Sequence, residues 1–429
     1  MLIKNAVVLD DRFQLSKKDI LTDGDRIQAV GVGLSAEGQE VLDASGLTAV
    51  PGFVDVHIHG CDGEDASNGT TEAIRTMARF LLKKGVTSFC PTTMTLPEES
   101  IARSLAAAKE CMEHPEPGAR VLGVHMEGPF VSIKRKGAQK GSYVRSPDYE
   151  MFRRLYDGCG GIVRMIVVAP ETEGADEFIQ KASQLCTVSI AHTESDYDQA
   201  KHSFDMGITH ATHLYNAMSG FSHRAPGVVG AVFDDERVMA EVICDGFHIH
   251  PAVVRTTFRY LGDRAIVVSD SMSAAGLEDG EYELGGQPVF VRDSKACLAD
   301  GTIAGSTTNL YQEMKNLVSW GIPLEQAVKS VSLLPAQSIG EDHRIGSICA
   351  GKLADIVLLD KDLNIVKVLQ NGKICYKSIT RRPCMGLLLA KPVQGSFLYR
   401  YQDSFKFSLA TASISLMRFS WLTRVALGS

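Results

Sequence analysis

The sequence lacks the features that mark several large classes of protein. Its 429 residues contain no uncharged apolar run of about 18 residues, the length that a membrane-spanning helix needs. The 10 cysteines are widely spread and include no Cys-x-x-Cys pair. The formal net charge is −7, with no basic excess to follow a phosphate backbone. We therefore expect neither a membrane protein nor a nucleic-acid-binding protein.

The amino-terminal segment also lacks the pattern of a secretory signal. The stretch MLIKNAVVLDD has no long apolar core and no small-residue cleavage site. Scattered cysteines in a chain of this length are typical of reduced thiols. Both observations predict a cytoplasmic protein.

What the sequence does contain is an alternation of strand-like and helix-like segments. Between residues 52 and 340, eight apolar runs such as VTSFCPTT and VRMIVVAPE alternate with helical stretches such as TTEAIRTMARFLLKKG. This alternation predicts an α/β protein whose architecture is a TIM-like (β/α)8 barrel. A doubly wound open sheet is the competing architecture. No Gly-x-Gly-x-x-Gly follows the first strand, which disfavours the dinucleotide-binding form of such a sheet.

The two ends of the chain differ from the middle. Residues 1–50 and 345–380 contain short strand-like runs separated by turn residues. They predict one small β-sandwich domain, built from both ends, beside a barrel over residues 51–344. Residues 384–429 form an atypical C-terminal tail with five basic residues and one acid. Two interpretations of the tail stay open: an extension that binds a partner or a lipid surface, and a segment with no evolved role.

Histidines gather where the predicted strands end. In PGFVDVHIHG, the strand period of two places His57 and His59 on one face. Functional side chains of a (β/α)8 barrel collect at the carboxyl ends of its strands. Three acids also end predicted strands: Glu127 in HMEGP, Asp245 in ICDGFHIH and Asp270 in VVSDSM. Of the 12 histidines, eight occupy such positions: His57, His59, His125, His192, His210, His213, His248 and His250.

These residue types are suited to a hydrolytic metal centre. Imidazoles and carboxylates hold divalent ions that activate water near neutral pH, and Glu127 is placed to bridge two ions. Asp270 ends the last strand, where an aspartate would take a proton from water and pass it to a leaving amine. We expect His125 and His210 to support the site rather than bind metal. The basic segment 133–141, IKRKGAQKG, is either a solvated loop or a lid that attracts an anionic substrate.

The strand-end motifs, in their order along the chain, resemble a known family. PGFVDVHIHG, HMEGPF, AHTESDY, ATHLYNAM, PGVVGAV, DGFHIHP, SDSM and DGTIAGS are similar to motifs of the N-acetylglucosamine-6-phosphate deacetylases of the amidohydrolase superfamily. The resemblance covers about residues 1–380. It implies a metal-dependent hydrolase that converts N-acetylglucosamine 6-phosphate to glucosamine 6-phosphate and acetate in amino-sugar catabolism or recycling. It also implies a homodimer.

The resemblance implies roles for individual residues. Glu127, His192 and His213 match the ligands of the main metal ion. His57 and His59 match the ligands of a second ion, so we expect one or two divalent ions, whether zinc, iron or manganese. Asp270 matches the general acid and base. The positions that match substrate contacts are His248, Asn216, the backbone of Ala217, Arg224 and Gln139, the last of which is a histidine in many relatives.

Two other functions stay open. Another amide hydrolase of the same superfamily, acting on a cyclic amide or an N-acyl amino acid, would show no preference for a phosphate on its substrate. A non-catalytic, metal-free binding protein on the same scaffold would have lost ligand residues. In this sequence every ligand position carries a side chain that can bind metal.

Overall fold

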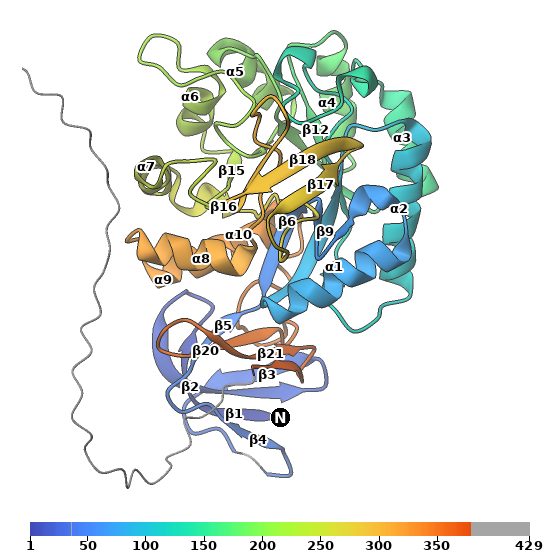
Figure 1. Cartoon of the computed structure of the whole chain (residues 1–429). Coiled ribbons are helices and arrows are strands. Elements are labelled where there is room, and N and C mark those ends of the chain that lie inside the picture. The colour runs from blue at the N-terminus through green and yellow to red at the C-terminus, as the bar shows by residue number, and fades with distance from the viewer. Residues whose placement is uncertain (36, 379–429) are drawn as a thin grey trace, which may run out of the picture. The chain divides into compact units, whose positions relative to one another are not determined.

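A computed structural model describes residues 1–35 and 37–378, and the predicted tail at 384–429 lies outside these residues. In the described part, eight parallel strands form a nearly closed barrel, so the predicted (β/α)8 architecture is confirmed (Figure 1). The strands are β6 (Phe53–Ile58), β9 (Val86–Thr93), β11 (Val124–Met126), β12 (Val163–Val168), β13 (Thr187–Ile190), β14 (His210–Ala211), β15 (Met239–Val242) and β16 (Ala265–Val267). A two-residue strand, β10 (Arg120–Val121), also pairs with β9.

Hydrogen bonds join the end of β6 to the segment that follows β16 and bring the two sides of the barrel together. The backbone amide of Asp270 donates to the carbonyl of His57 at 3.0 Å, and the amide of His59 donates to the carbonyl of Ser271 at 2.9 Å. Deeper in the barrel, the hydroxyl of Ser269 donates to Asp55 at 2.6 Å. This closure places the histidines of β6 beside the aspartate that follows β16.

Helices follow the strands and cover the outside of the barrel (Figure 1). In the first of them, the hydroxyl of Thr70 accepts from the amide of Ala73 and so caps the helix, and Ile74, Met77 and Leu81 repeat on its buried face. The helices are α1 (Thr71–Lys83), α2 (Glu98–Glu113), α3 (Tyr149–Gly158), α4 (Ala175–Ala182), α5 (Tyr197–Met206), α6 (Gly227–Asp234), α7 (Pro251–Leu261), α8 (Leu310–Ser319), α9 (Leu324–Ser330) and α10 (Leu333–Ser338).

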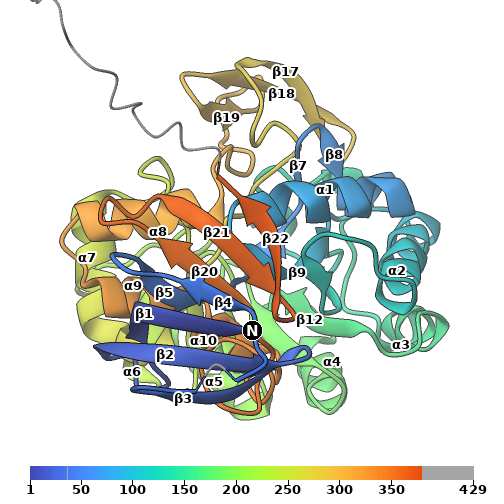
Figure 2. The same ribbon diagram turned by 90° about the horizontal axis from the view of Figure 1, so that it is seen from below.

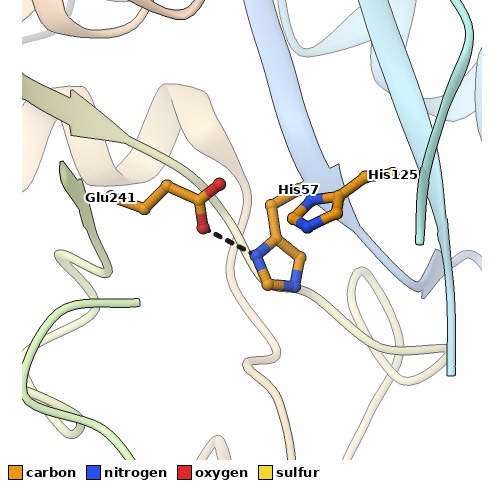
Figure 3. Close-up of side chains that lie close together, drawn as sticks. All are labelled: His57, His125 and Glu241. Atoms are coloured by element: carbon orange, nitrogen blue, oxygen red, sulfur yellow. Dashed lines mark hydrogen bonds and ion pairs between the residues drawn. The ribbon is translucent and has the colours of Figure 1, made fainter. Parts of the chain in front are cut away.

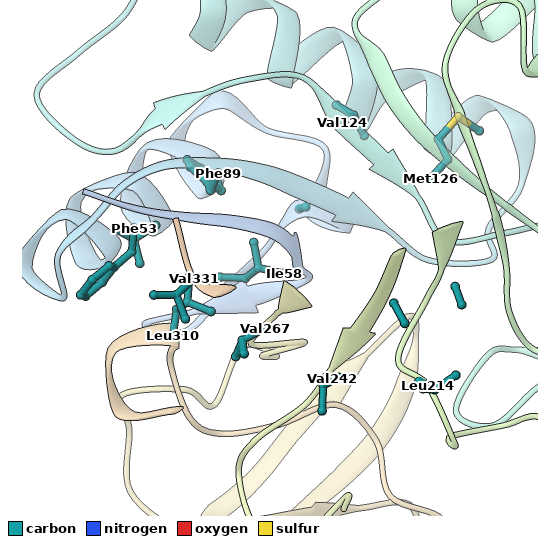
Figure 4. Close-up of a cluster of buried hydrophobic side chains, with 14 of the residues drawn as sticks. Phe53, Ile58, Phe89, Val124, Met126, Leu214, Val242, Val267, Leu310 and Val331 are labelled. Atoms are coloured by element: carbon teal, nitrogen blue, oxygen red, sulfur yellow. The ribbon is translucent and has the colours of Figure 1, made fainter. Parts of the chain in front are cut away.

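The apolar core lies between the strands and these helices. Phe53, Phe89 and Val267 from the strands pack in one buried cluster with Leu310 of α8 and Val331 (Figure 4). Burying large side chains removes much apolar surface from water, at about 1.5–3 kcal/mol for each side chain. The strands are therefore held rigidly, and so are the polar residues at their carboxyl ends.

The two ends of the chain share a second sheet, as predicted. Its strand order is β22-β21-β20-β5-β1-β2-β3, with β4 beside β1. Strand β5 of the amino-terminal segment pairs antiparallel with β20, which joins the two segments (Figure 2). The strands are β1 (Leu2–Leu9), β2 (Leu15–Asp23), β3 (Arg26–Gly31), β4 (Val41–Asp43), β5 (Thr48–Pro51), β20 (Ile356–Leu359), β21 (Ile365–Gln370) and β22 (Lys373–Lys377).

A small antiparallel sheet between β16 and α8 was not predicted from the sequence. It consists of β17 (Gly280–Leu284), β18 (Gln287–Arg292) and β19 (Lys295–Cys297). The start of β18 contacts the basic segment 133–141, where Gln287 donates its side-chain amide to the carbonyl of Ala138. None of the helices in the described residues is long and apolar enough to cross a membrane.

Candidate metal centre and substrate cavity

The carboxyl ends of the barrel strands open into a cavity of about 530 Å³. It collects most of the residues to which the sequence analysis gave a role: His59, Glu127, Gln139, His192, His213, Asn216, Ala217, His248 and Asp270. His57 is fully buried and contacts this group through His59. Arg224 is the exception, because it lies in an exposed loop and lines a different hollow together with Arg135 and Glu194.

Glu127 lies at the centre of the first group of possible metal ligands. It follows β11, and its Oε1 atom is 3.1 Å from His192 Nε2 and 2.9 Å from His213 Nε2. The two imidazole nitrogens are 3.1 Å apart. All three side chains are buried.

The second group shares Glu127. His57 Nε2 and His59 Nε2 are 3.3 Å apart, and they lie 3.7 Å and 3.3 Å from the two carboxylate oxygens of Glu127. Asp270 Oδ1 is 3.4 Å from the nitrogen of His57 and 3.2 Å from that of His59. Glu127 is thus within reach of both groups of histidines.

The donor set suits divalent ions. His192 Nδ1 lies 2.8 Å from the carbonyl of Arg135, and His59 Nδ1 lies 3.2 Å from the carbonyl of Thr92. A carbonyl only accepts, so in the neutral form of each ring the hydrogen is on Nδ1 and Nε2 presents a lone pair to the site. Ligand bonds of about 2.0–2.1 Å around a tetrahedral ion place neighbouring nitrogens about 3.3–3.4 Å apart. The separations of the paired histidines are close to that value.

The electrostatics of the site also call for positive charge. Burial raises the pKa of Glu127, but His192, His213 and His59 outweigh burial and hold that pKa well below its ordinary value. Burial lowers the pKa of His59, but hydrogen bonds and charges of Asp270 and Glu127 raise it well above its ordinary value. Glu127 and Asp270 are therefore ionised. A cation bound between them would compensate their negative charge, as protons on the imidazoles do.

Among the candidate metal ligands and the candidate proton acceptor, three residues have a left-handed backbone. The φ angles are 46° at His192, 35° at His213 and 43° at Asp270. A non-glycine residue in this region costs about 1–3 kcal/mol and persists only where the surrounding structure imposes it. The three side chains are thus turned into the cavity by backbone conformations that the rest of the fold stabilises.

His248 and Asp245 form a pair beside the cavity. Asp245 accepts from the backbone amide of His248 at 2.9 Å and lies 2.7 Å from its Nδ1 atom. The carboxylate therefore orients the ring of His248, which lines the cavity. The sequence placed both residues at the end of β15, but the pairing required the tight turn after that strand.

One functional side chain was missed by the sequence analysis. Glu241 of β15 is fully buried and lies 2.8 Å from His57 Nδ1. A signal was present, because Glu241 is the single charged residue within the apolar run VMAEVI. A buried acid in such a run requires a partner, and the sequence offers no means to tell which histidine that partner is.

Comparisons with known proteins agree with this geometry. Residues 48–375 match the model of the amidohydrolase family. The chain is 33% identical over 390 residues to the N-acetylglucosamine-6-phosphate deacetylase of Bacillus subtilis strain 168, covering 88% of this chain and 98% of that protein. It is also 33% identical over 350 residues to the N-acetylgalactosamine-6-phosphate deacetylase of Escherichia coli O157:H7, covering 81% of this chain and 91% of that protein.

A solved structure extends the similarity to the fold. It is that of a mutant N-acetyl-D-glucosamine-6-phosphate deacetylase from Mycobacterium smegmatis in complex with N-acetyl-D-glucosamine-6-phosphate. The TM-score is 0.82 and the sequence identity 32%, and the match covers 87% of this chain and 99% of that one.

Proposed function

Because this chain belongs to the amidohydrolase family, we propose that it hydrolyses the acetamide of N-acetyl-D-glucosamine 6-phosphate to D-glucosamine 6-phosphate and acetate. The observation that carries the proposal is the buried group of imidazoles around Glu127, which opens with Asp270 into one cavity. The reaction belongs to the catabolism or recycling of amino sugars. The other functions considered from the sequence, a different amide hydrolase and a metal-free binding protein, are not favoured by the relatives.

The residues of the site suit one or two divalent ions. Glu127, His192 and His213 would hold the first ion, and His57 and His59 a second, with Glu127 between the two positions. A bound divalent ion supplies Lewis acidity, which polarises an amide carbonyl and acidifies water. Zinc, iron and manganese all accept such donors.

Asp270 is the proposed general base and general acid. Charge from His57 and a hydrogen bond from His59 outweigh burial and lower the pKa of Asp270, so it is ionised and able to accept a proton. It takes a proton from the attacking water and returns it to the amide nitrogen as the carbon–nitrogen bond breaks. His248 would donate to the carbonyl oxygen as negative charge develops there.

The phosphate of the substrate would be held at the mouth of the cavity. Asn216 and the backbone of Ala217 line the cavity, as does Lys136 of the basic segment 133–141. Arg224 is outside the cavity of its own chain. We propose that it acts across the interface of a homodimer, in which the loop after His213 reaches the cavity of the partner.

An exposed apolar surface supports the proposed homodimer. Phe221 and Tyr260 are 56% and 61% exposed and flank the ring of Phe233, so an apolar surface adjoins the Arg224 loop.

Nine cysteines of the described residues are free thiols, which supports a cytoplasmic location. We also propose that the chain is divided into a barrel domain over residues 51–344 and a β domain formed by residues 1–50 and 345–380.

An acetate-release assay tests the proposal directly. The metal-loaded protein is given N-acetylglucosamine with and without the 6-phosphate, at equal concentrations. We expect kcat/KM for the phosphorylated sugar to be at least about 100-fold higher, because a desolvated charge pair contributes several kcal/mol. Equal rates on both sugars would instead indicate another amide hydrolase.

A second candidate substrate follows from the relative in Escherichia coli. That protein is an N-acetylgalactosamine-6-phosphate deacetylase, and its identity to this chain equals that of the Bacillus subtilis enzyme. The two sugars differ only in the configuration of one hydroxyl group. The same assay with N-acetylgalactosamine 6-phosphate therefore decides which sugar is preferred.

A further inference from the structure

Glu241 connects β6, β14 and the segment that follows β14, beneath the metal centre. Its carboxylate lies 2.8 Å from His57 Nδ1 and 3.1 Å from His210 Nε2, and it accepts from the backbone amide of His213 at 3.3 Å. Figure 3 shows the bond between Glu241 and His57, with the ring of His125 beside it. Glu241 is fully buried, so these contacts replace the water that an ionised carboxylate requires.

The contact with Glu241 determines which nitrogen of His57 faces the metal centre. An ionised carboxylate accepts only, so the hydrogen of the neutral His57 ring is on Nδ1. Its Nε2 atom then presents a lone pair toward His59 Nε2, 3.3 Å away. Without an acceptor at Nδ1, the hydrogen could move to Nε2 and block a metal ion there.

The acceptor behind His57 differs from those behind His59 and His192. His59 and His192 each donate to a backbone carbonyl, that of Thr92 or that of Arg135. Among the described ligand rings, His57 is the one whose outer nitrogen contacts a carboxylate. A carboxylate increases the basicity of an imidazole more than a carbonyl does, and so strengthens its bond to a metal.

The charge of Glu241 is not cancelled by its other neighbours. His210 donates to it through Nε2, and its Nδ1 has no hydrogen-bond partner within the described residues. His125 lies against His57 with ring centroids 4.7 Å apart, but its Nδ1 is directed to the carbonyl of Val56. The negative charge of Glu241 is therefore compensated best through the ring of His57, by a cation at Nε2.

We propose that Glu241 is a positioning residue for the second metal position, the one formed by His57 and His59, and that it sets the affinity of this position for a divalent ion. The first position, formed by Glu127, His192 and His213, depends on it much less, because Glu241 contacts only the backbone amide of His213. The inference rests on the proposed metal centre and not on the identity of the sugar.

The test compares Glu241→Gln with Glu313→Gln. Glu313 of α8 is an equally buried glutamate, but it accepts from the backbone amide of Cys244 and is outside the metal centre. Each protein is loaded with zinc and dialysed, and bound zinc per chain is measured by elemental analysis. Competition with a chromophoric chelator then gives the two dissociation constants.

We expect two ions in the parent and in Glu313→Gln, and a selective weakening of one ion in Glu241→Gln by about 10- to 100-fold, the usual effect of removing such a partner. Glu241→Asp keeps the negative charge but moves it away from His57. Its affinity for the second ion should therefore lie between that of the parent and that of Glu241→Gln. It also provides the measurement if the glutamine variant does not fold.

Three results would overturn the proposal. Glu241→Gln with the parent's two dissociation constants would show that Glu241 does not act on the metal centre. Equal weakening of both ions would show general support of the site. A parent protein that binds a single ion would show that the second metal position does not exist. If that protein still released acetate from the phosphorylated sugar, the proposed deacetylase function would be unaffected.

Discussion

The side-chain amide of Gln139 donates to Oε2 of Glu127 at 2.5 Å, and its carbonyl oxygen accepts from the backbone amide of Thr95 at 2.7 Å. Gln139 was expected to contact the substrate. In the structure it is only 1% exposed and is engaged with the central carboxylate of the site. Its contact therefore fixes the orientation of Glu127 between the two groups of histidines.

We predict that Gln139→Glu lowers metal affinity or kcat/KM by about 10- to 100-fold, because it removes the donor to a ligand carboxylate. The new carboxylate would also repel Glu127 unless it is protonated. Metal content and steady-state kinetics measure the effect. Gln312→Glu, on the exposed face of α8, is the control and should match the parent. A Gln139 variant with parental kinetics would mean that Glu127 is oriented by its histidines alone.

Replacing His192 should abolish metal binding at the first position. His192→Ala removes one of three buried ligand groups, so bound metal and acetate release should both be lost, while circular dichroism stays that of a folded protein. His202→Ala on α5 changes a histidine that is exposed and paired with Asp176, and should retain both. Full activity of His192→Ala without bound metal would contradict the metal-dependent mechanism.

Replacing Asp270 should affect the chemical step more than metal binding. Asp270→Asn preserves the size of the side chain but removes the proton acceptor, so kcat should fall by about 100-fold or more. Metal content and KM should change far less. A kcat within a few-fold of the parent would assign the proton transfer to another group.

Arg224→Ala should weaken kcat/KM for the phosphorylated sugar by about 2–4 kcal/mol and leave the unphosphorylated sugar nearly unaffected. The arginine is outside its own cavity, so the effect should depend on the dimer. Mixing Arg224→Ala with Asp270→Asn chains should restore activity, because one cavity of each mixed dimer then has both residues intact. Equal losses on both sugars would show that Arg224 supports the loop rather than binding phosphate.

A prediction on stability concerns Asp235, which follows α6. It accepts from Arg237 at 2.7 Å and from Lys201 at 3.0 Å, and its side chain is 5% exposed. The hydrogen bonds of Arg237 outweigh burial and lower the pKa of Asp235. A lowered folded-state pKa stabilises the fold above the unfolded value of about 3.9, and this contribution is lost as the pH falls.

Asp235→Asn should therefore reduce the free energy of unfolding at pH 7 by about 1–3 kcal/mol, and the difference should shrink as the pH falls below about 4. Urea unfolding at both pH values measures it. Asp234→Asn, at a neighbouring side chain that is 62% exposed, should have a much smaller effect. A difference that is independent of pH would assign the effect to packing rather than to charge.

The sequence predicted the fold because strand and helix periods are local properties. All eight barrel strands correspond to apolar runs such as VTSFCPTT, which became β9. The β17–β19 sheet was missed because its strands are short and, in β17, largely exposed, so they carry no strong apolar signal. The association of the two chain ends was inferred from their strand-like runs, and only the structure gives the pairing of β5 with β20 and its register.

For the site, the sequence determined which chemical groups are available and at which strand ends they lie. His57, His59 and Glu127 could be proposed as ligands because a strand end fixes the position of a side chain within its own segment. Only the tertiary structure decided which atoms meet. His57 contacts Glu241 across 184 positions of sequence, and Gln139, which lines the cavity, donates its side-chain amide to Glu127. Such contacts depend on barrel closure and on rotamers chosen by packing, and neither is encoded in a local pattern of residues.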